Sequence, residues 1–241
     1  MLTLINKFIV EYDGMEIIMF NVAIDGPAGA GKSTIAKLVA KKLGFTYVDT
    51  GSMYRAMALA CIRAGVASND EENVYKVCES LDVSLKYDEN GAQQVILNDE
   101  NVNAYIRTEE VGNMTSAIAV YGPVREKLVE LQRKLATEYD VIMDGRDIGT
   151  CVLKDAPVKI YLTASSITRA ERRYKELTEK GVECNIDEIE KDIIDRDYRD
   201  MHREISPLAQ AEDAILVDSS DMNIEQVVEH LVDIIDKKRA N

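Results

Sequence analysis

The chain has 241 residues, a formal net charge of −14 and an apolar fraction of 46%. This length suits one domain of above-average size with small insertions, and the apolar fraction is sufficient for a hydrophobic core. Because broad nucleic-acid binding depends on neutralising phosphates with basic side chains, the acidic balance argues against DNA or RNA as a partner. A small anionic substrate is compatible with it, provided that positive charge gathers locally.

The supply of histidine and cysteine excludes several kinds of site. The sequence has two histidines and four scattered cysteines, with no C-x-x-C pair. This pattern excludes a zinc site of ordinary spacing and predicts free thiols in a reducing cytoplasm. With only two histidines, the sequence also offers few candidates for a Ser-His-Asp catalytic triad. We expect a cytoplasmic monomer with neither nucleic-acid nor membrane partners.

Residues 1–18 stand apart from the rest of the chain. The stretch is mildly apolar but contains charged residues at 7, 11, 13 and 16, so it is too short and too charged for a membrane span. It is either an additional strand or oligomerisation arm, or an extension outside the working protein, which then begins at Met15 or Met19. We favour the second interpretation, because unanchored termini are commonly poorly ordered. Its role stays open.

From residue 20 onward, apolar runs alternate with helical patterns. The first run, 20–25, ends at a glycine, and 33–43 then has one apolar helical face. Further runs of strand length lie at 46–48, 141–144, 158–162 and 214–217. Further helical patterns cover 51–64, 109–137, 166–180, 186–203 and 223–238. This alternation predicts an α/β fold with a parallel sheet.

The segment 66–105 interrupts this alternation. Apolar and polar residues alternate over 83–87 and 95–97, on either side of Asn90-Gly91. Asn-Gly favours the two-residue type I′ turn of a β-hairpin, and a third short strand is expected at Val102. We therefore predict a small antiparallel β insertion at 66–105, carried by an α/β core that comprises 19–65 and 106–241.

The segment GPAGAGKS, from Gly26 to Ser33, matches the P-loop pattern. Glycines let the loop wrap its backbone N–H groups around the β-phosphate, and the following helix adds its positive dipole end. Lys32 is expected to reach the β- and γ-phosphates, and the Ser33 hydroxyl to bind Mg²⁺. The alternative is a glycine-rich turn with an exposed lysine, but an apolar strand before the loop and an amphipathic helix after it favour ATP. The predicted ATP-binding residues are Gly26, Pro27, Ala28, Gly29, Ala30, Gly31, Lys32, Ser33 and Thr34.

Two groups of arginines are candidates for a second anion site. They are Arg196, Arg199 and Arg203, spaced to share one helical face, and Arg169, Arg172 and Arg173. Like charges on one face of a helix repel each other unless an anionic group neutralises them. Either the acidic residues at 195, 200 and 204 neutralise the arginines, or the arginines bind phosphate. The spacing alone leaves both possibilities open. The P-loop favours phosphate, because phosphoryl transfer depends on positioning and charge stabilisation.

The motif order now identifies a family. The segments are IDGPAGAGKST (24–34), DTGSMYRAMAL (49–59), IRTEEV (106–111), DGRDIGT (144–150), DAPVKIYLTAS (155–165) and DRDYRDMHREISPL (195–208). With these, the chain from about Phe20 onward resembles the bacterial cytidylate (CMP) kinases, members of the nucleoside monophosphate kinase family. The resemblance implies transfer of the γ-phosphoryl group of ATP, with Mg²⁺, to CMP or dCMP, giving ADP and CDP or dCDP in pyrimidine nucleotide metabolism.

The resemblance also implies roles for residues at the matching positions. The implied CMP-binding residues are Thr50, Tyr54, Arg55, Ser116, Arg125, Asp147, Arg196, Asp200 and Arg203. Among them, Arg55, Arg196 and Arg203 would hold the acceptor phosphate. Ser116 and Arg125 would face the cytosine, and Asp147 and Asp200 the sugar. Each has a structural alternative: Tyr54 as a core aromatic, for example, or Ser116 as a surface hydroxyl.

The resemblance also implies a P-loop fold in three layers around a five-stranded parallel sheet. Its lid, at about 166–185, would close over ATP and carry Arg169, Arg172 and Arg173. The implied catalytic residues are Lys32, Arg169, Arg172 and Arg196. Asp144 would join Ser33 at the metal, through water, although it is equally suited to cap a helix or turn.

Two other functions remain open from the sequence. One is another small-molecule P-loop kinase, of the UMP or shikimate type. The other is a non-catalytic nucleotide-binding switch that has no acceptor. The sequence lacks the Asn-Lys-x-Asp motif of guanine-specific proteins, and its arginine groups favour a kinase over a switch.

Overall fold

The computed structural model describes residues 9–12, 15–89 and 91–240, and the chain forms two compact units. The first unit comprises 1–47 and 137–241, and the second comprises 48–136. The second unit is therefore larger than the 66–105 insertion expected from the sequence. We describe each unit by itself.

A five-stranded sheet has the strand order β10-β9-β3-β8-β4. Its strands are β3 (Val22–Asp25), β4 (Thr46–Asp49), β8 (Val141–Asp144), β9 (Val158–Thr163) and β10 (Ile215–Asp218). β3 pairs in parallel with both β8 and β9, and β9 pairs in parallel with β10. The predicted α/β fold with a five-stranded parallel sheet is confirmed. Because parallel strands end at one edge, the carboxyl ends of β3 and β8 lie together where the P-loop begins.

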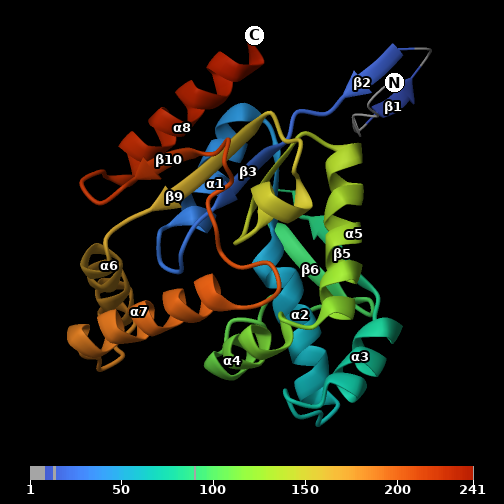
Figure 1. The fold of residues 1–241 in the computed structure, drawn as a ribbon, viewed down its shortest axis with the longest axis vertical. Helices are drawn as coiled ribbons and strands as arrows, with labels where there is room; N and C mark the ends of the chain where they lie inside the picture. The colour runs from blue at the N-terminus through green and yellow to red at the C-terminus, as the bar shows by residue number, and fades with distance from the viewer. Residues whose placement is uncertain (1–8, 13–14, 90, 241) are drawn as a thin grey trace. The chain divides into compact units, whose positions relative to one another are not determined.

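Two helices of the first unit cover one face of this sheet (Figure 1). They are α1 (Lys32–Leu43), which follows the P-loop, and α8 (Ile224–Arg239), and they pack against each other. Their apolar faces join the core through residues such as Ile35, Val39 and Leu231. Asn223 and Gln226 form a reciprocal capping box that fixes where α8 begins.

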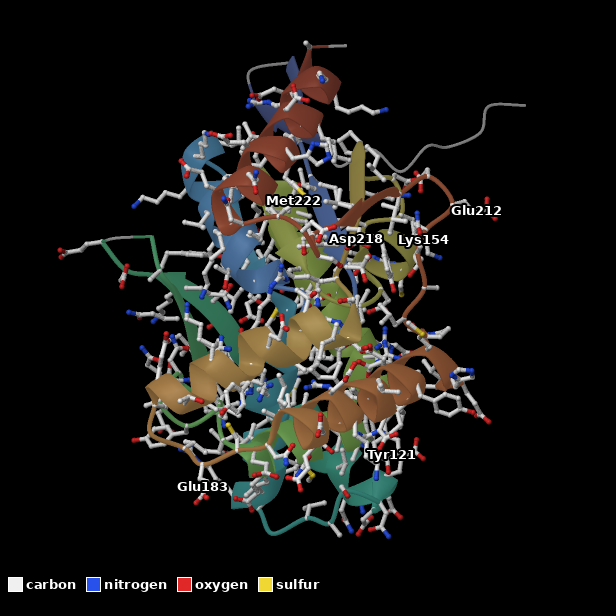
Figure 2. The ribbon with its side chains drawn as sticks, turned by 90° about the vertical axis from the view of Figure 1, so that its left-hand side faces the viewer. Tyr121, Lys154, Glu183, Glu212, Asp218 and Met222 are labelled. Atoms are coloured by element: carbon white, nitrogen blue, oxygen red, sulfur yellow. The ribbon has the colours of Figure 1, made fainter. Side chains whose placement is uncertain are left out.

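The helices α6 (Ser166–Glu179) and α7 (Ile186–His202) lie side by side, with Glu183 at the bend between them (Figure 2). α7 ends at His202, so Arg203 lies one residue beyond the helix, in an extended conformation with φ −67° and ψ 144°. The expectation that Arg203 continues the helical face of Arg196 and Arg199 is therefore wrong. A single π-helical turn, η1 (Ile148–Val152), follows β8 and has no clear signal in the sequence.

The second unit contains a separate antiparallel sheet, in the order β5-β6-β7. Its strands are β5 (Val83–Tyr87), β6 (Gln93–Leu97) and β7 (Glu100–Asn101). The predicted hairpin is confirmed, but its connection is not a two-residue turn, because Tyr87 pairs with Gln93. The N–H of Gly91 donates to the carbonyl of Asp88, and Gly91 adopts the left-handed φ of 74°. Asn90 lies outside the described residues.

The helices of the second unit are α2 (Thr50–Arg63), α3 (Glu71–Ser80), α4 (Glu109–Ile118) and α5 (Gly122–Glu138). α3 is absent from the sequence prediction. The single helical stretch predicted at 109–137 is wrong, because the helix is interrupted at 119–121. Pro123 explains the interruption: its ring would clash with the carbonyl of Ala119 in a continuous helix, whereas the first turn of a new helix tolerates proline.

Part of the N-terminal stretch forms a separate two-stranded antiparallel pair, β1 (Ile9–Tyr12) with β2 (Met15–Ile18). Residues 1–8 and 13–14 lie outside the described residues. None of the helices over the described ranges combines the length and hydrophobicity that crossing a membrane requires.

Candidate active site

The P-loop between β3 and α1 owes its shape to glycine. Gly26 has a φ of 146°, and a Cβ on it would lie 1.9 Å from the carbonyl oxygen of Leu162 in β9. Gly31 has a φ of 85° and begins α1 as its N-cap. Lack of space therefore excludes a side chain at Gly26, and the left-handed backbone disfavours one at Gly31. The first N–H groups of α1 remain directed at the loop, as anion binding requires.

Lys32 is buried in its own loop. Its ammonium donates to the carbonyl of Pro27 at 2.7 Å, and the side chain is 6% exposed. Burial lowers the pKa of Lys32 well below its usual value, and the nearby charge of Arg146 lowers it further, as does that of Arg196. Asp144 and Asp25 act in the opposite direction on this pKa. The lysine is thus held beside two arginines, in a position that favours an arriving anion.

Asp144 lies at the carboxyl end of β8 and is 4% exposed. One carboxylate oxygen accepts the hydroxyl of Ser33 at 2.8 Å, and the other accepts the phenol of Tyr47 at 2.7 Å. These contacts place it beside the P-loop rather than at the cap of a helix. Ser33 and Asp144 supply oxygen donors only, which is the set that Mg²⁺ prefers. In the described part of the chain, no three His, Cys, Asp or Glu side chains cluster as a metal site.

The DGRDIGT segment brings the expected acceptor residues of the first unit together. Arg146 donates to Asp200 of α7 at 2.9 Å, and Arg203 lies 4.0 Å from Asp147. All four side chains are buried or half-buried. Two arginines and two aspartates alternate here, so the segment can offer cations to a phosphate and carboxylates to sugar hydroxyls. Arg199 does not join them: it is exposed, and its Nε donates to the carbonyl of Asp195 in its own helix.

The η1 turn is anchored to β3 by Asp25. Its two carboxylate oxygens accept the N–H groups of Ile148 at 2.8 Å and Gly149 at 2.7 Å. Burial raises the pKa of Asp25 to about 6, although both hydrogen bonds lower it. Asp147, the residue before the turn, raises this pKa as well, and Lys32 lowers it.

The arginines of α6 differ sharply in their surroundings. Arg169 is 6% exposed and donates to the carbonyls of Ala28, in the P-loop, and Ala164, each at 2.9 Å. It also forms an ion pair with Asp197 of α7 at 2.7 Å. Arg172 donates to the carbonyl oxygen of Ser219 at 2.7 Å, in the loop after β10. Arg173 is exposed and pairs with Glu176 of its own helix.

The remaining predicted CMP-binding residues belong to the second unit. Thr50 begins α2 and is buried, and Tyr54 and Arg55 follow one turn later and are half-buried. The guanidinium of Arg125 is buried 5.9 Å from the centre of the Tyr54 ring, which is a cation–π distance. Arg55 donates to the carbonyl of Ile106 at 3.3 Å. Within this unit, Arg125 therefore lies beside Tyr54, and Arg55 is held by the backbone at Ile106.

Ser116 behaves differently from its neighbours. Its side chain is exposed, and its hydroxyl donates to the carbonyl of Gly112 in the same helix, α4, at 3.2 Å. Arg55 also lies beside α4, since a Cβ on Gly112 would be 3.5 Å from its Nη1. The surface-hydroxyl alternative describes the present contacts of Ser116, and its predicted role stays a prediction.

Three site residues escaped the sequence reasoning: Arg146, Asp25 and Asp197. The signal for Arg146 and Asp25 lay within the quoted motifs, since both adjoin predicted site residues, Asp147 and Gly26. Asp197 stood between two predicted residues of the same helix, but only the contact with Arg169 gives it a role.

The comparisons with known proteins agree with this geometry. A family model described as cytidylate kinase matches residues 22–237. The cytidylate kinase of Clostridium acetobutylicum is 51% identical over 218 residues, which cover 90% of this chain and 98% of that protein. The cytidylate kinase of Lactobacillus johnsonii is 47% identical over 228 residues, covering 95% of this chain and 98% of that protein.

A solved structure of an uncharacterized protein from Eubacterium ventriosum superposes with a TM-score of 0.50 at 12% identity, covering 90% of this chain and 99% of that chain. At this identity the likeness concerns the fold alone. The family model, in contrast, spans most of the chain, and relatives with about half of their residues identical cover nearly all of it. The chain therefore belongs to the cytidylate kinase family.

Proposed function

We propose that this chain transfers the γ-phosphoryl group of ATP to CMP or dCMP, giving ADP and CDP or dCDP. Family membership supports the reaction, because the relatives are named cytidylate kinases. One structural observation carries the site assignment: Arg146 and Arg196 lie close enough to Lys32 to lower its pKa. The lysine of the donor loop and two arginines of the acceptor side thus converge within the first unit.

Such a cluster of cations costs free energy unless an anion neutralises it. Two phosphorylated substrates would supply that charge, with the triphosphate on the P-loop and the monophosphate against the arginines. When ATP binds, the Lys32 ammonium exchanges the carbonyl of Pro27, now 2.7 Å away, for phosphate oxygens. This exchange explains how a buried lysine is held ready for the nucleotide without being left unsatisfied.

The chemistry requires no general base. The phosphate dianion of CMP is already a nucleophile, and its oxygen attacks the γ-phosphorus in line while the β–γ bridging oxygen leaves with ADP. Lys32 and Arg196 stabilise the charge that spreads over the transferred group, and Arg169 and Arg172 contribute from the lid. The enzyme's main contribution is thus position and charge, which fits a sequence with only two histidines.

The residues beside the P-loop fit a divalent cation, because Ser33 and Asp144 present only oxygen atoms. We assign these two residues to Mg²⁺, which would arrive with ATP and neutralise part of its phosphate charge. Asp144 is 4% exposed and already bonded to Ser33, so it is suited to act through a water molecule of the metal rather than directly.

We assign recognition of the acceptor to the predicted CMP-binding residues. Arg196, Arg203 and Arg55 bind its phosphate, together with Arg146, which the sequence did not single out. Asp147 and Asp200 accept hydrogen bonds from sugar hydroxyls. The cytosine is assigned to Arg125 and Ser116, whose donors suit its O2 and N3, and Thr50 and Tyr54 line this side of the site.

A substrate panel tests this proposal. The purified protein is supplied with ATP, Mg²⁺ and one of CMP, dCMP, UMP, AMP, GMP or shikimate, and ADP release is measured with a coupled assay. We expect CMP and dCMP to be the fastest acceptors. The Lys32→Ala variant is the inactive reference, with kcat lower by roughly three orders of magnitude. Preference for AMP, GMP or shikimate would reassign the acceptor, and a rate that no acceptor raises would make the protein a nucleotide-dependent switch.

A further inference from the structure

Asp25 is a buried charge at the centre of the first unit that phosphate binding does not use. It is the last residue of β3, directly before Gly26, and its side chain is 4% exposed. Its carboxylate does not take part in the P-loop. Both of its oxygens instead accept backbone N–H groups from a distant segment. The donors are Ile148 at 2.8 Å and Gly149 at 2.7 Å, more than 120 residues later in the chain.

Those two amides begin the η1 turn, which follows directly on Arg146 and Asp147. The turn is closed by its own backbone, since the N–H of Cys151 donates to Asp147 and that of Leu153 donates to Ile148. These bonds close the turn, so the two hydrogen bonds to Asp25 hold the backbone directly after Arg146 and Asp147. These side chains face Asp200 and Arg203, respectively.

We propose that Asp25 is a positioning residue, whose carboxylate ties the ATP-binding loop to the segment that holds the phosphate and sugar of the acceptor. This inference rests on the proposed function, because it gives Asp25 its effect through residues assigned to CMP. The tie joins the donor and acceptor halves of the first unit, beside two other hydrogen bonds between them: Ser33 donates to Asp144, and the N–H of Gly145 donates to the carbonyl of Ile24. Phosphoryl transfer depends on the alignment of two substrates, so such a tie acts on the rate of transfer more than on ATP binding.

The chemistry of the contact requires a carboxylate. Two adjacent N–H donors need two acceptor oxygens, and asparagine would turn its own NH₂ donor toward one of them. A Cβ at position 149 would lie 3.4 Å from Oδ2 of Asp25 and 3.2 Å from Cδ of Lys159, so the backbone of Gly149 packs close to the carboxylate.

The carboxylate of Asp25 lies in surroundings that disfavour its charged form. Burial raises the pKa of Asp25 to about 6, and the neighbouring charge of Asp147 also raises it, whereas Lys32 and the two amides lower it. Burial raises the pKa of Tyr161, in β9, and the charges of Asp197 and Asp25 raise it further. Natural proteins retain a buried charge that folding disfavours mainly where function needs its geometry.

The Asp25→Asn variant of the full chain tests the proposal, with Asp140→Asn as the matched control. The carboxylate of Asp140 accepts the N–H of Phe20 at 2.6 Å, at the opposite end of β3, so the control makes the same chemical change far from the turn. We measure kcat, KM for CMP, Kd for ATP by calorimetry, and hydrogen exchange of the amides of Ile148 and Gly149.

We expect Asp25→Asn to lower kcat roughly 100-fold, the cost of a misplacement of about 1 Å, while Kd for ATP changes less than about twofold. Exchange of the Ile148 and Gly149 amides should accelerate in this variant alone, and Asp140→Asn should retain the wild-type kcat. A variant with accelerated exchange but unchanged kcat would overturn the proposal, as would one whose main defect is ATP affinity.

The Asp25→Glu variant provides a second test if asparagine prevents folding. Glutamate keeps both acceptor oxygens, so its kcat should fall less than 100-fold with Kd for ATP again unchanged; a larger loss in ATP affinity than in kcat would contradict the inference. The two proposals fail separately. A wild-type protein that is inactive toward CMP refutes the proposed function, whereas an active wild type with an equally active Asp25→Asn variant refutes only the role of Asp25.

Discussion

Two buried ionisable residues, Asp25 directly before the P-loop and Lys32 within it, have pKa values that are shifted in opposite directions. Burial is the largest cause in both cases: it raises the pKa of Asp25 to about 6 and lowers that of Lys32 well below its usual value. Each group is therefore pushed toward its neutral form by the protein alone. A bound polyphosphate would favour the charged form of Lys32, so substrate and residue stabilise each other's charge.

The raised pKa of Asp25 predicts a pH-dependent contribution to stability. The folded-state pKa of about 6 lies above the ordinary value of 3.8, so the folded protein binds this proton more tightly than the unfolded chain does. The resulting stabilisation is fully present below pH 3.8 and is lost as the pH rises through 6. The change corresponds to roughly 3 kcal/mol. Urea unfolding of the wild type and Asp25→Asn at a series of pH values measures it.

The comparison uses the difference between the two proteins, because other carboxylates titrate equally in both. We expect the stability of the wild type, relative to the variant, to decline between about pH 4 and pH 7. A difference that is constant over this range would mean that the carboxylate has an ordinary pKa in the folded protein.

Arg203 and Arg199 offer a second comparison between single residues. Arg203 is half-buried, donates to the carbonyl of Ser206 at 2.6 Å and lies 4.0 Å from Asp147, whereas Arg199 is exposed. We predict that Arg203→Ala raises KM for CMP about 10- to 100-fold, the range expected for a hydrogen bond to a charged group. Steady-state kinetics at saturating ATP measure this.

The matched control is Arg199→Ala, for which we expect KM for CMP within about twofold of wild type, because its side chain contacts only its own helix. Equal effects of the two substitutions would contradict the assignment of Arg203 to the acceptor phosphate.

Among the elements, those with strong local signals were predictable from sequence. The P-loop lies between an apolar strand and an amphipathic helix, and the structure has β3 and α1 there. The hairpin was predictable from alternation, but its loop was not, because a turn around Asp88 and Gly91 competes with the Asn-Gly turn. The η1 turn depends on Asp25, a residue far away in sequence, so no local pattern could reveal it.

The residues of the candidate site also differ in how far the sequence predicted their surroundings. Lys32 and Ser33 follow from a motif whose chemistry is local. The contacts of Arg169 with Ala28 and Asp197 depend on how α6 packs, which spacing does not determine. The boundary of α7 at His202 likewise changed the surroundings of Arg203, because one residue beyond a helix is enough to leave its face.

Arg169 links three elements: α6, which carries it, the P-loop and α7. Its planar guanidinium reaches the carbonyls of Ala28 and Ala164 and the carboxylate of Asp197 at the same time. Lysine has a single ammonium and cannot span them. We predict that Arg169→Lys raises KM for ATP about tenfold and lowers the melting temperature, because it leaves buried acceptors without their donor.

Arg173→Lys is the matched control for this prediction, since it makes the same change on the same helix at a residue that pairs only with exposed Glu176. We expect its KM for ATP and melting temperature to stay close to wild type. Thermal unfolding and steady-state kinetics on both variants distinguish the cases, and similar losses in the two would show that Arg169 acts only as a surface charge.

For the molecule as a whole, the net charge is negative, whereas the candidate site contains a local group of positive charges. The chain carries a net charge of −14, yet Arg146 and Arg196 lie near Lys32. A negative net charge and a local group of cations are compatible, because a small phosphate responds to the charges close to it. The predicted acceptor residues are distributed over both compact units, with Arg55 and Arg125 in the second. In the proposed reaction both substrates carry phosphate, so catalysis depends on the bound acceptor.

This dependence predicts that ATP is not turned over without an acceptor. Water is a competing nucleophile, and kinases of this kind avoid hydrolysis by completing their site only when the acceptor is bound. We expect ADP release with ATP and Mg²⁺ alone to be at least about 100-fold slower than with CMP present. Cytidine is the control, because it offers base and sugar but no phosphate, and it should not raise the rate. With CMP, ADP and CDP should form in equal amounts. An ATPase rate that cytidine stimulates as strongly as CMP does would mean that the phosphate is not what completes the site, and the arginines would need another role.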